Sequence, residues 1–152
     1  MHASGSRLDR PSAHVLRLLP HVKPPPARLL LVGAGTGHEA RALDARGYDV
    51  SVLEPEAAPQ VGELPVVAAE FGSTDFGGRF DLLCEIGAFA RMPRAEWVAA
   101  AARALRPGGQ AFGAFPNDAS ALLHAVGAAF EIERCEPTGG GDALLEVVLR
   151  RR

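Results

Sequence analysis

The chain has 152 residues, of which 47% are hydrophobic and 22% are charged, and its formal net charge at pH 7 is -2. This length predicts one domain, and the composition is that of a globular protein, which excludes a disordered or fibrous chain. Proteins whose main task is to grip nucleic acid are usually basic, so the balance of charge argues against nucleic acid as a partner.

Cysteine usage and apolar patterning indicate a protein of the cytoplasm. The two cysteines, Cys84 and Cys135, lie far apart and lack metal-ligand spacing. Buried free thiols in a reducing compartment are therefore favoured over a zinc site or a disulfide. No apolar run approaches the ~20 residues of a membrane span, and the first ten residues lack a signal-peptide pattern. We expect no bound metal, no membrane partner and a cytoplasmic location.

Residues 1–26 are predicted to form an N-terminal arm with one short helix. Ser12 is a suitable cap for this helix, an apolar stripe runs through AHVLRLLP, and Pro20 ends it. A proline-rich linker of extended geometry follows at 23–26. The main domain is predicted at 27–152, with the short helix as a lid.

The main domain alternates predicted strands and helices. A continuous apolar run at 28–32 fits a strand covered on both faces, and a glycine-rich loop follows it. The sequence then predicts a helix at 38–46, with Gly47 as its C-terminal cap. The remaining predicted elements are strands at 48–53, 66–69 and 80–85, a helix with Pro93 in its first turn, a strand at 110–115, a helix ending at Val126, and strands at 130–135 and 143–149.

This alternation of elements predicts the architecture of the sheet. Strands that alternate with helices imply parallel pairing. The short loop between the last two strands implies an antiparallel hairpin at one edge. We therefore predict an α/β fold built on a mostly parallel seven-stranded sheet with a C-terminal antiparallel hairpin.

The order strand, glycine loop, helix, strand and acidic residue indicates a nucleotide site. Gly33, Gly35 and Gly37 allow close approach of the backbone to a ligand, and the following helix offers unpaired N–H groups to an anion. Glu54, at the end of the second strand, is placed to accept both hydroxyls of a ribose. The spacing departs from the G-x-G-x-x-G of dinucleotide enzymes, because His38 stands where the third glycine would fall.

Three segments extend this pattern: LLLVGAGTGHEARALDARGYDVSVLEPE, FDLLCEIGAFARMP and ALRPGGQAFGAF. Taken in this order, they resemble the Rossmann-like S-adenosylmethionine-dependent methyltransferases. Within that class, the chain is most similar to small-molecule enzymes of the thiopurine and tellurite methyltransferase type. The resemblance runs from about Arg28 to Leu149, and it implies a single-domain Rossmann-like methyltransferase fold with S-adenosylmethionine as cofactor.

The resemblance also implies roles for the residues that follow the first two strands. The glycine loop would pass the methionine part of the cofactor, through Gly33, Ala34, Gly35 and Gly37. Glu54 would bind the ribose hydroxyls, the same role that its position at a strand end indicates.

Residues after the third and fourth strands are the remaining candidates for the site. By the resemblance, Glu70 and Phe71 would border the adenine, with a core position as the alternative for Phe71. Glu85 would lie beside the transferable methyl group and is the candidate catalytic residue, as a base or a substrate contact. His38 could titrate near neutrality beside the loop, and Arg91 could meet an anionic substrate, but surface positions are favoured for both.

These features predict methyl transfer from S-adenosylmethionine to a small-molecule nucleophile. The alternative is a degenerate methyltransferase fold that acts as a non-catalytic cofactor-binding or partner-binding module. Leu31 favours this alternative, because the class usually has an acidic residue there. The short segment after Glu54 and the lack of substrate-pocket insertions favour it too. A nicotinamide-dependent enzyme is disfavoured by His38, and a homodimer could complete the thinly covered pocket.

Overall fold

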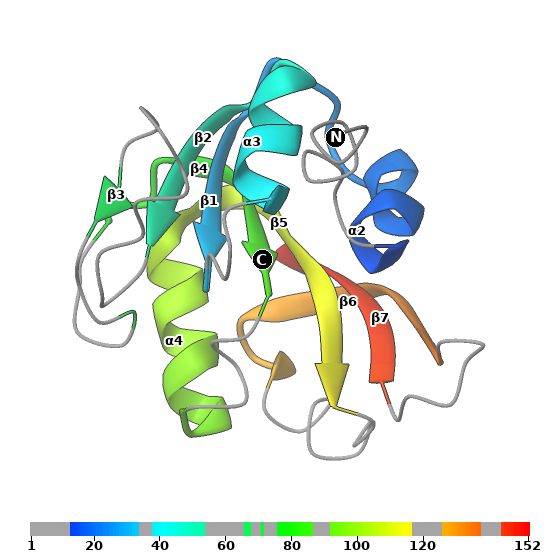
Figure 1. Cartoon of the computed structure of the whole chain (residues 1–152). Coiled ribbons are helices and arrows are strands. Elements are labelled where there is room, and N and C mark those ends of the chain that lie inside the picture. Colours follow the sequence, from blue (N-terminus) through cyan, green and yellow to red (C-terminus); the bar gives the residue numbers. More distant parts are fainter. Residues whose placement is uncertain are drawn as a thin grey trace.

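One mixed sheet forms the centre of the protein. Within the described residues its seven strands follow the order β3-β2-β1-β4-β5-β7-β6 (Figure 1). The predicted α/β class is confirmed. The computed structural model describes residues 13–33, 38–53, 66–67, 71, 76–86, 92–116, 126–137 and 144–152.

Parallel pairing joins the first five strands of the sheet, and β1 lies between β2 and β4. The order of the strands therefore reverses at β1, which is the point where open α/β sheets bind ligands. Beyond β5, the strands β7 and β6 pair antiparallel. The strands are β1 (Arg28–Val32), β2 (Asp49–Leu53), β3 (Val66–Val67), β4 (Phe80–Glu85), β5 (Leu105–Pro116), β6 (Phe130–Pro137) and β7 (Leu144–Arg151).

Two of these strands, β1 and β4, have the predicted bounds, whereas β5 begins five residues before its prediction. Phe80 of β4 pairs with Leu105, whereas Leu82, two residues later, pairs with Gln110. The segment 106–109 therefore bulges out of the ladder, which explains why Pro-Gly-Gly marks a break in the pattern without ending the strand. The helix predicted to end at Val126 lies almost entirely outside the described residues.

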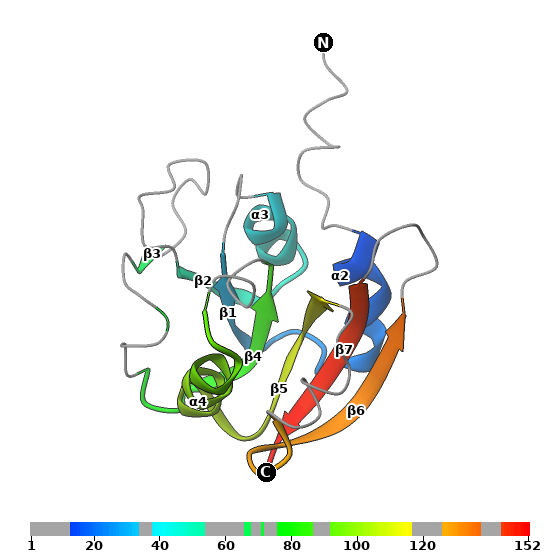
Figure 2. The same ribbon diagram turned by 90° about the horizontal axis from the view of Figure 1, so that it is seen from below.

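Helices cover both faces of the sheet (Figure 2). Helix α2 (Ala13–Leu18), the 3-10 turn η1 (Leu19–His21) and α3 (His38–Ala45) lie on one face, and α4 (Arg94–Ala104) lies on the other. Among the described residues, no helix has the length and apolar character needed to span a membrane.

The ends of the helices follow the local chemistry of proline and glycine. Helix α2 ends before Pro20 as predicted, but the chain continues through Pro20 in η1, because proline is tolerated in a first turn. Gly47 has a φ of 99° after α3, which is the left-handed conformation of a C-terminal cap. Pro93 was predicted in the first turn of α4, but it lies one residue before the helix, where its carbonyl accepts the Trp97 N–H at 3.0 Å.

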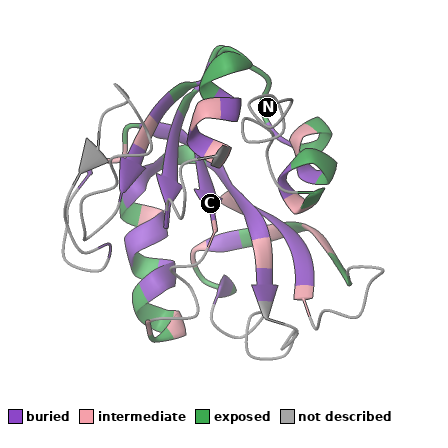
Figure 3. Ribbon diagram, in the orientation of Figure 1, coloured by how far each residue is buried: buried purple, intermediate pink, exposed green. Residues whose placement is uncertain are grey.

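The apolar run of β1 is buried on both of its faces, as predicted for a central strand. Leu29 and Leu31 pack in the cluster with α2 and α3, whereas Leu30 and Val32 pack in the cluster with α4. Figure 3 shows that burial extends across the middle of the sheet and along the inner side of α4. This two-sided core fixes the ends of β1 and β4 relative to each other.

Candidate functional site

The carboxyl ends of β1 and β4 lie side by side where the strand order reverses. Val32 and Glu85 are direct partners in the parallel ladder, and the Ile86 N–H donates to the Val32 carbonyl at 3.0 Å. Gly33, the next residue of β1, donates its N–H to the Leu53 carbonyl at 3.2 Å and has a φ of 85°. A side chain is disfavoured in that conformation, so a glycine belongs at this strand end.

Glu85 is buried at this edge and is held by α4. Its side chain lies on the α4 face, the residue is 2% exposed, and its Oε1 accepts the indole N–H of Trp97 at 2.8 Å. Trp97 in turn packs edge-on against Phe115, with ring centroids 5.2 Å apart. The indole therefore fixes the orientation of the Glu85 carboxylate. Trp97 belongs to the core cluster on the α4 face, and the sequence analysis did not identify its bond to Glu85.

Strand β5 approaches Glu85 closely from the other side. Gly113 is the partner of Glu85 in the β4–β5 ladder. A Cβ at Gly113 would collide with the Glu85 carbonyl oxygen and would lie 3.1 Å from the Glu85 Cβ. Glycine at this position therefore lets the two strands close around the carboxylate.

Cys84 lies next to Glu85 at the carboxyl end of β4. Burial raises the pKa of the Cys84 thiol well above its usual value, and the charges of Glu39 and Glu85 raise it further. Cys84 thus stays protonated, in agreement with the predicted buried free thiol. Glu39 lies in the first turn of α3, directly after the glycine loop, and the sequence analysis did not single it out.

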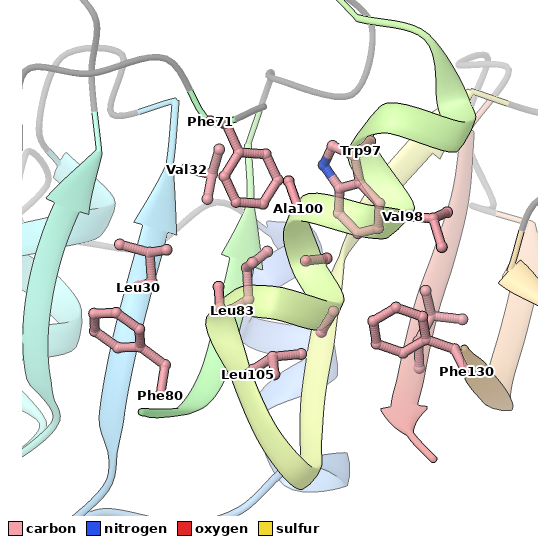
Figure 4. Packing of buried hydrophobic residues seen from close by; sticks show 14 of the residues in the cluster. Leu30, Val32, Phe71, Phe80, Leu83, Trp97, Val98, Ala100, Leu105 and Phe130 are labelled. Atoms are coloured by element: carbon pink, nitrogen blue, oxygen red, sulfur yellow. The ribbon is translucent and has the colours of Figure 1, made fainter. Parts of the chain in front are cut away.

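Phe71 lies in the core beside this edge. It is buried, and its ring centroid is 6.2 Å from that of Trp97 and 6.4 Å from that of Phe76. Figure 4 shows Phe71 between Val32 and Trp97, above Leu83. Phe71 is thus part of the core cluster, and its contact with adenine stays a prediction.

The other predicted site residues lie outside the part of the chain whose structure is described, and their roles stay predictions. His38 begins α3, but its side chain is not among the described ones. The residues outside the described part are Ala34, Gly35, Gly37, Glu54, Glu70 and Arg91.

A polar cluster joins α2 to the sheet near the same edge. Glu146 on β7 is 7% exposed, and its Oε2 accepts from Arg17 Nε at 2.6 Å and contacts His14 Nδ1 at 3.0 Å. Its partner in β5 is Ala114, the residue after Gly113. Arg17 and then His14 lower the pKa of the Glu146 carboxyl. The sequence analysis missed this cluster, although a lone carboxylate within LLEVVL was its signal.

No group of three or more metal-ligating side chains occurs within the described residues. Val15 and Leu18 of α2 are fully buried against the sheet, so the predicted lid helix is packed on its α3 face. A lid function for α2 stays a prediction.

No protein-family model matches the sequence, and no curated protein gives a significant match. Solved structures nevertheless resemble this one over most of its length. A TehB-like S-adenosylmethionine-dependent methyltransferase from Corynebacterium glutamicum is 21% identical with a TM-score of 0.78, and the match covers 97% of this chain and 92% of that chain.

Two further solved structures have the same architecture. An S-adenosylmethionine-dependent methyltransferase from Mesorhizobium loti is 16% identical, with a TM-score of 0.79 over 95% of this chain and 100% of that one. A 1,6-didemethyltoxoflavin N1-methyltransferase from Burkholderia thailandensis is 20% identical, with a TM-score of 0.73 over 95% and 78% of the two chains. The chain thus has a Rossmann-like methyltransferase fold, and at these identities the likeness concerns the fold alone.

Proposed function

We propose that the protein transfers a methyl group from S-adenosylmethionine to a small-molecule nucleophile. The observation that carries this proposal is the pairing of Val32 with Glu85, which brings Gly33 and a buried carboxylate together where the strand order reverses. The fold supports it, because the similar solved structures named above are methyltransferases.

The acidic residues of the described part suit the charge of this cofactor. S-adenosylmethionine carries a sulfonium and an ammonium group, and two acidic residues stand in this region, Glu85 at the end of β4 and Glu39 in the first turn of α3. Leu31, where an acidic residue was expected, is fully buried and is the ladder partner of Cys84. Glu85 follows Cys84 directly, so a carboxylate stands on the strand beside Leu31.

The protein contributes mainly alignment to such a reaction. When bound, the cofactor supplies a methyl group on a good leaving group, so the remaining task is to hold the acceptor in line with it. Positioning of this kind contributes about 7–11 kcal/mol to lowering a barrier. Glu85, fixed by Trp97, provides an oriented negative charge for this purpose or a base for an acceptor that must lose a proton.

The finer assignments of the site belong to the same proposal. Gly33, Ala34, Gly35 and Gly37 contact the methionine part of the cofactor, and Glu54 binds the ribose hydroxyls. The three-glycine loop and the acidic residue after the second strand support these contacts.

The surroundings of the site complete the proposal. Glu70 and Phe71 border the adenine, and the arm of residues 1–26 covers the acceptor side of the domain at 27–152. The protein acts in the cytoplasm, and a second copy of the chain covers the part of the pocket that lacks insertions.

Thermal unfolding with S-adenosylmethionine, with NAD as the control ligand, tests cofactor binding. A ligand at ~100 times its Kd stabilises a fold by about 2.7 kcal/mol, which is a rise in Tm of roughly 5–11 °C for a chain of this size. We expect this rise with S-adenosylmethionine alone. Glu54→Ala should abolish it, whereas the matched control Glu131→Ala, an exposed glutamate on β6, should keep it. Unchanged affinity in Glu54→Ala would refute the ribose assignment.

Turnover separates the enzyme from a non-catalytic binding module. Thiols, oxyanions and small amines are incubated with protein and S-adenosylmethionine, and S-adenosylhomocysteine release is followed by mass spectrometry. Release that depends on one acceptor class supports methyl transfer. Binding of S-adenosylmethionine without release for any class would instead favour the binding module.

A further inference from the structure

A polar cavity of about 560 Å³ lies at the amino ends of β4 and β5, at the opposite edge of the sheet from Gly33 and Glu85. We call it the amino-edge pocket. Segments far apart in the sequence meet there: the chain after η1, the start of β4, the bulge of β5 and the end of β7. Its polar lining includes Lys23, Asp81, Arg106, Gly108, Gln110 and Arg150.

Asp81 holds two of the cations at this pocket. The residue is 8% exposed, and its Oδ1 lies 2.9 Å from Arg106 Nε and 3.4 Å from Lys23 Nζ, while its Oδ2 accepts the Arg28 backbone N–H at 2.9 Å. The side chains of Lys23 and Arg106 are 44% and 55% exposed. The carboxylate therefore lies beneath the two cations, which remain accessible to solvent.

Arg150 is held in the same manner by a second carboxylate. Its Nε donates to Glu133 at 2.7 Å, and its Nη1 donates to the Gly108 carbonyl at 2.9 Å. The other oxygen of Glu133 accepts from Gln110 Nε2 at 2.8 Å. Arg150 thus has a fixed position, and 43% of its side chain is exposed.

The two carboxylates engage the arginines through Nε and leave further N–H groups for a ligand. Arg106 contacts Asp81 through Nε, so both of its terminal amino groups can donate to a ligand. Gly108 has a φ of 82°, and a Cβ there would meet no atom within 4 Å, so the bulge is open on this side. Lys23, Arg106 and Arg150 against Asp81 and Glu133 leave a net positive charge.

We propose that the amino-edge pocket binds a phosphate group, either free or on a small metabolite. Guanidinium forks and an ammonium group are the side chains that suit a phosphate oxyanion, and they are preorganised here by buried or anchored carboxylates. The site is separate from the methyl-transfer site, and it does not depend on the proposed function.

The competing explanation is that these groups only attach the N-terminal arm to the sheet. They do make that attachment: the Lys23 N–H donates to Gln110 Oε1 at 2.9 Å, and the Tyr48 hydroxyl donates to the Lys23 carbonyl at 3.3 Å. The Lys23 ammonium also joins the arm to Asp81, but the heads of Arg106 and Arg150 take no part in these contacts of Lys23. Replacing an arginine head therefore tests ligand binding while those contacts remain.

The test is an NMR titration of the full chain with inorganic phosphate and with ribose 5-phosphate, at constant ionic strength set by sodium chloride. We expect saturable shifts of the Gly108 and Gly109 amides. Arg106→Gln and Arg150→Gln should each weaken binding about tenfold to a hundredfold, the effect of losing a charge-assisted contact. Arg46→Gln, an exposed arginine directly after α3 that does not line the pocket, is the matched control and should bind as the parent does.

Further variants and ligands keep this test decisive. If a glutamine variant fails to fold, Arg150→Lys replaces it in the test. This change keeps the positive charge but removes the guanidinium fork, so we expect an intermediate affinity. Tighter binding of ribose 5-phosphate identifies a phosphorylated metabolite, and equal affinities identify the phosphate group alone. Shifts that chloride reproduces, or full affinity in both glutamine variants, would overturn the proposal.

Discussion

The two ends of β4 show how one strand presents opposite chemistry at its two edges. Each end carries a buried carboxylate, Asp81 at the amino end and Glu85 at the carboxyl end. A neutral indole donor from Trp97 binds Glu85, whereas cations from Lys23 and Arg106 surround Asp81.

This difference in partners decides which ligand each edge suits. At the carboxyl edge, the Trp97 indole orients the Glu85 carboxylate without contributing a positive charge. At the amino edge, the two cations balance the charge of the Asp81 carboxylate, which holds them in position, so this edge attracts an anion. Buried carboxylates therefore indicate a ligand's charge only when their partners are known.

The largest expected difference between the two edges concerns their glycines. Gly113→Ala should destabilise the fold by about 3 kcal/mol, because the new methyl group collides with the backbone of Glu85. Gly108→Ala should cost only about 1 kcal/mol, since its φ of 82° is strained for alanine but the space is open. Urea unfolding measures both. Equal losses would show that β5 does not close tightly on β4 at the carboxyl edge.

A smaller effect is expected from removing the donor of each carboxylate. Trp97→Phe should lower the free energy of unfolding by about 2 kcal/mol, because the buried hydrogen bond to the Glu85 carboxyl is removed. Arg106→Gln should lower the free energy of unfolding by less than about 1 kcal/mol, since the arginine side chain of this ion pair is half exposed. Far-UV circular dichroism in urea follows both variants, and a double-mutant cycle of Trp97→Phe with Glu85→Gln should give a coupling above about 0.5 kcal/mol. A coupling near zero would contradict the proposed orientation of Glu85.

The smallest expected effect is a loss of stability in acid, which arises from the protonation of Asp81 at the amino edge. Burial would raise the pKa of Asp81, but the Arg28 N–H, Lys23 and Arg106 outweigh it and hold the pKa below the usual 3.8. Because the folded pKa is lowered, the stabilisation is complete above 3.8 and is lost as pH falls through the folded value.

Asp81→Asn should therefore be less stable than the parent at neutral pH, and the gap should close in strong acid. Urea midpoints measured from neutral pH to below the usual pKa of aspartate check this. A gap that stays constant with pH would mean that the charge of Asp81 contributes nothing.

The sequence by itself determined the features that depend on neighbouring residues. The apolar runs of β1 and β4 gave the correct bounds, because a strand buried on both faces needs continuous hydrophobicity. Gly47 marked the end of α3, since few other residues adopt its conformation. The alternation of strands and helices indicated the α/β class, and the position of Glu85 at a strand end made it a candidate for the site.

Only the tertiary structure decided which side chains meet. Trp97 reaches Glu85 from α4, and Arg17 reaches Glu146 across 129 positions of the chain. The amino-edge pocket joins Lys23 to Arg150, and no local pattern relates residues so far apart. Such contacts depend on the order and register of the strands. That order is set by packing over the whole sheet, because a shift of one residue in register exchanges the two faces of a strand.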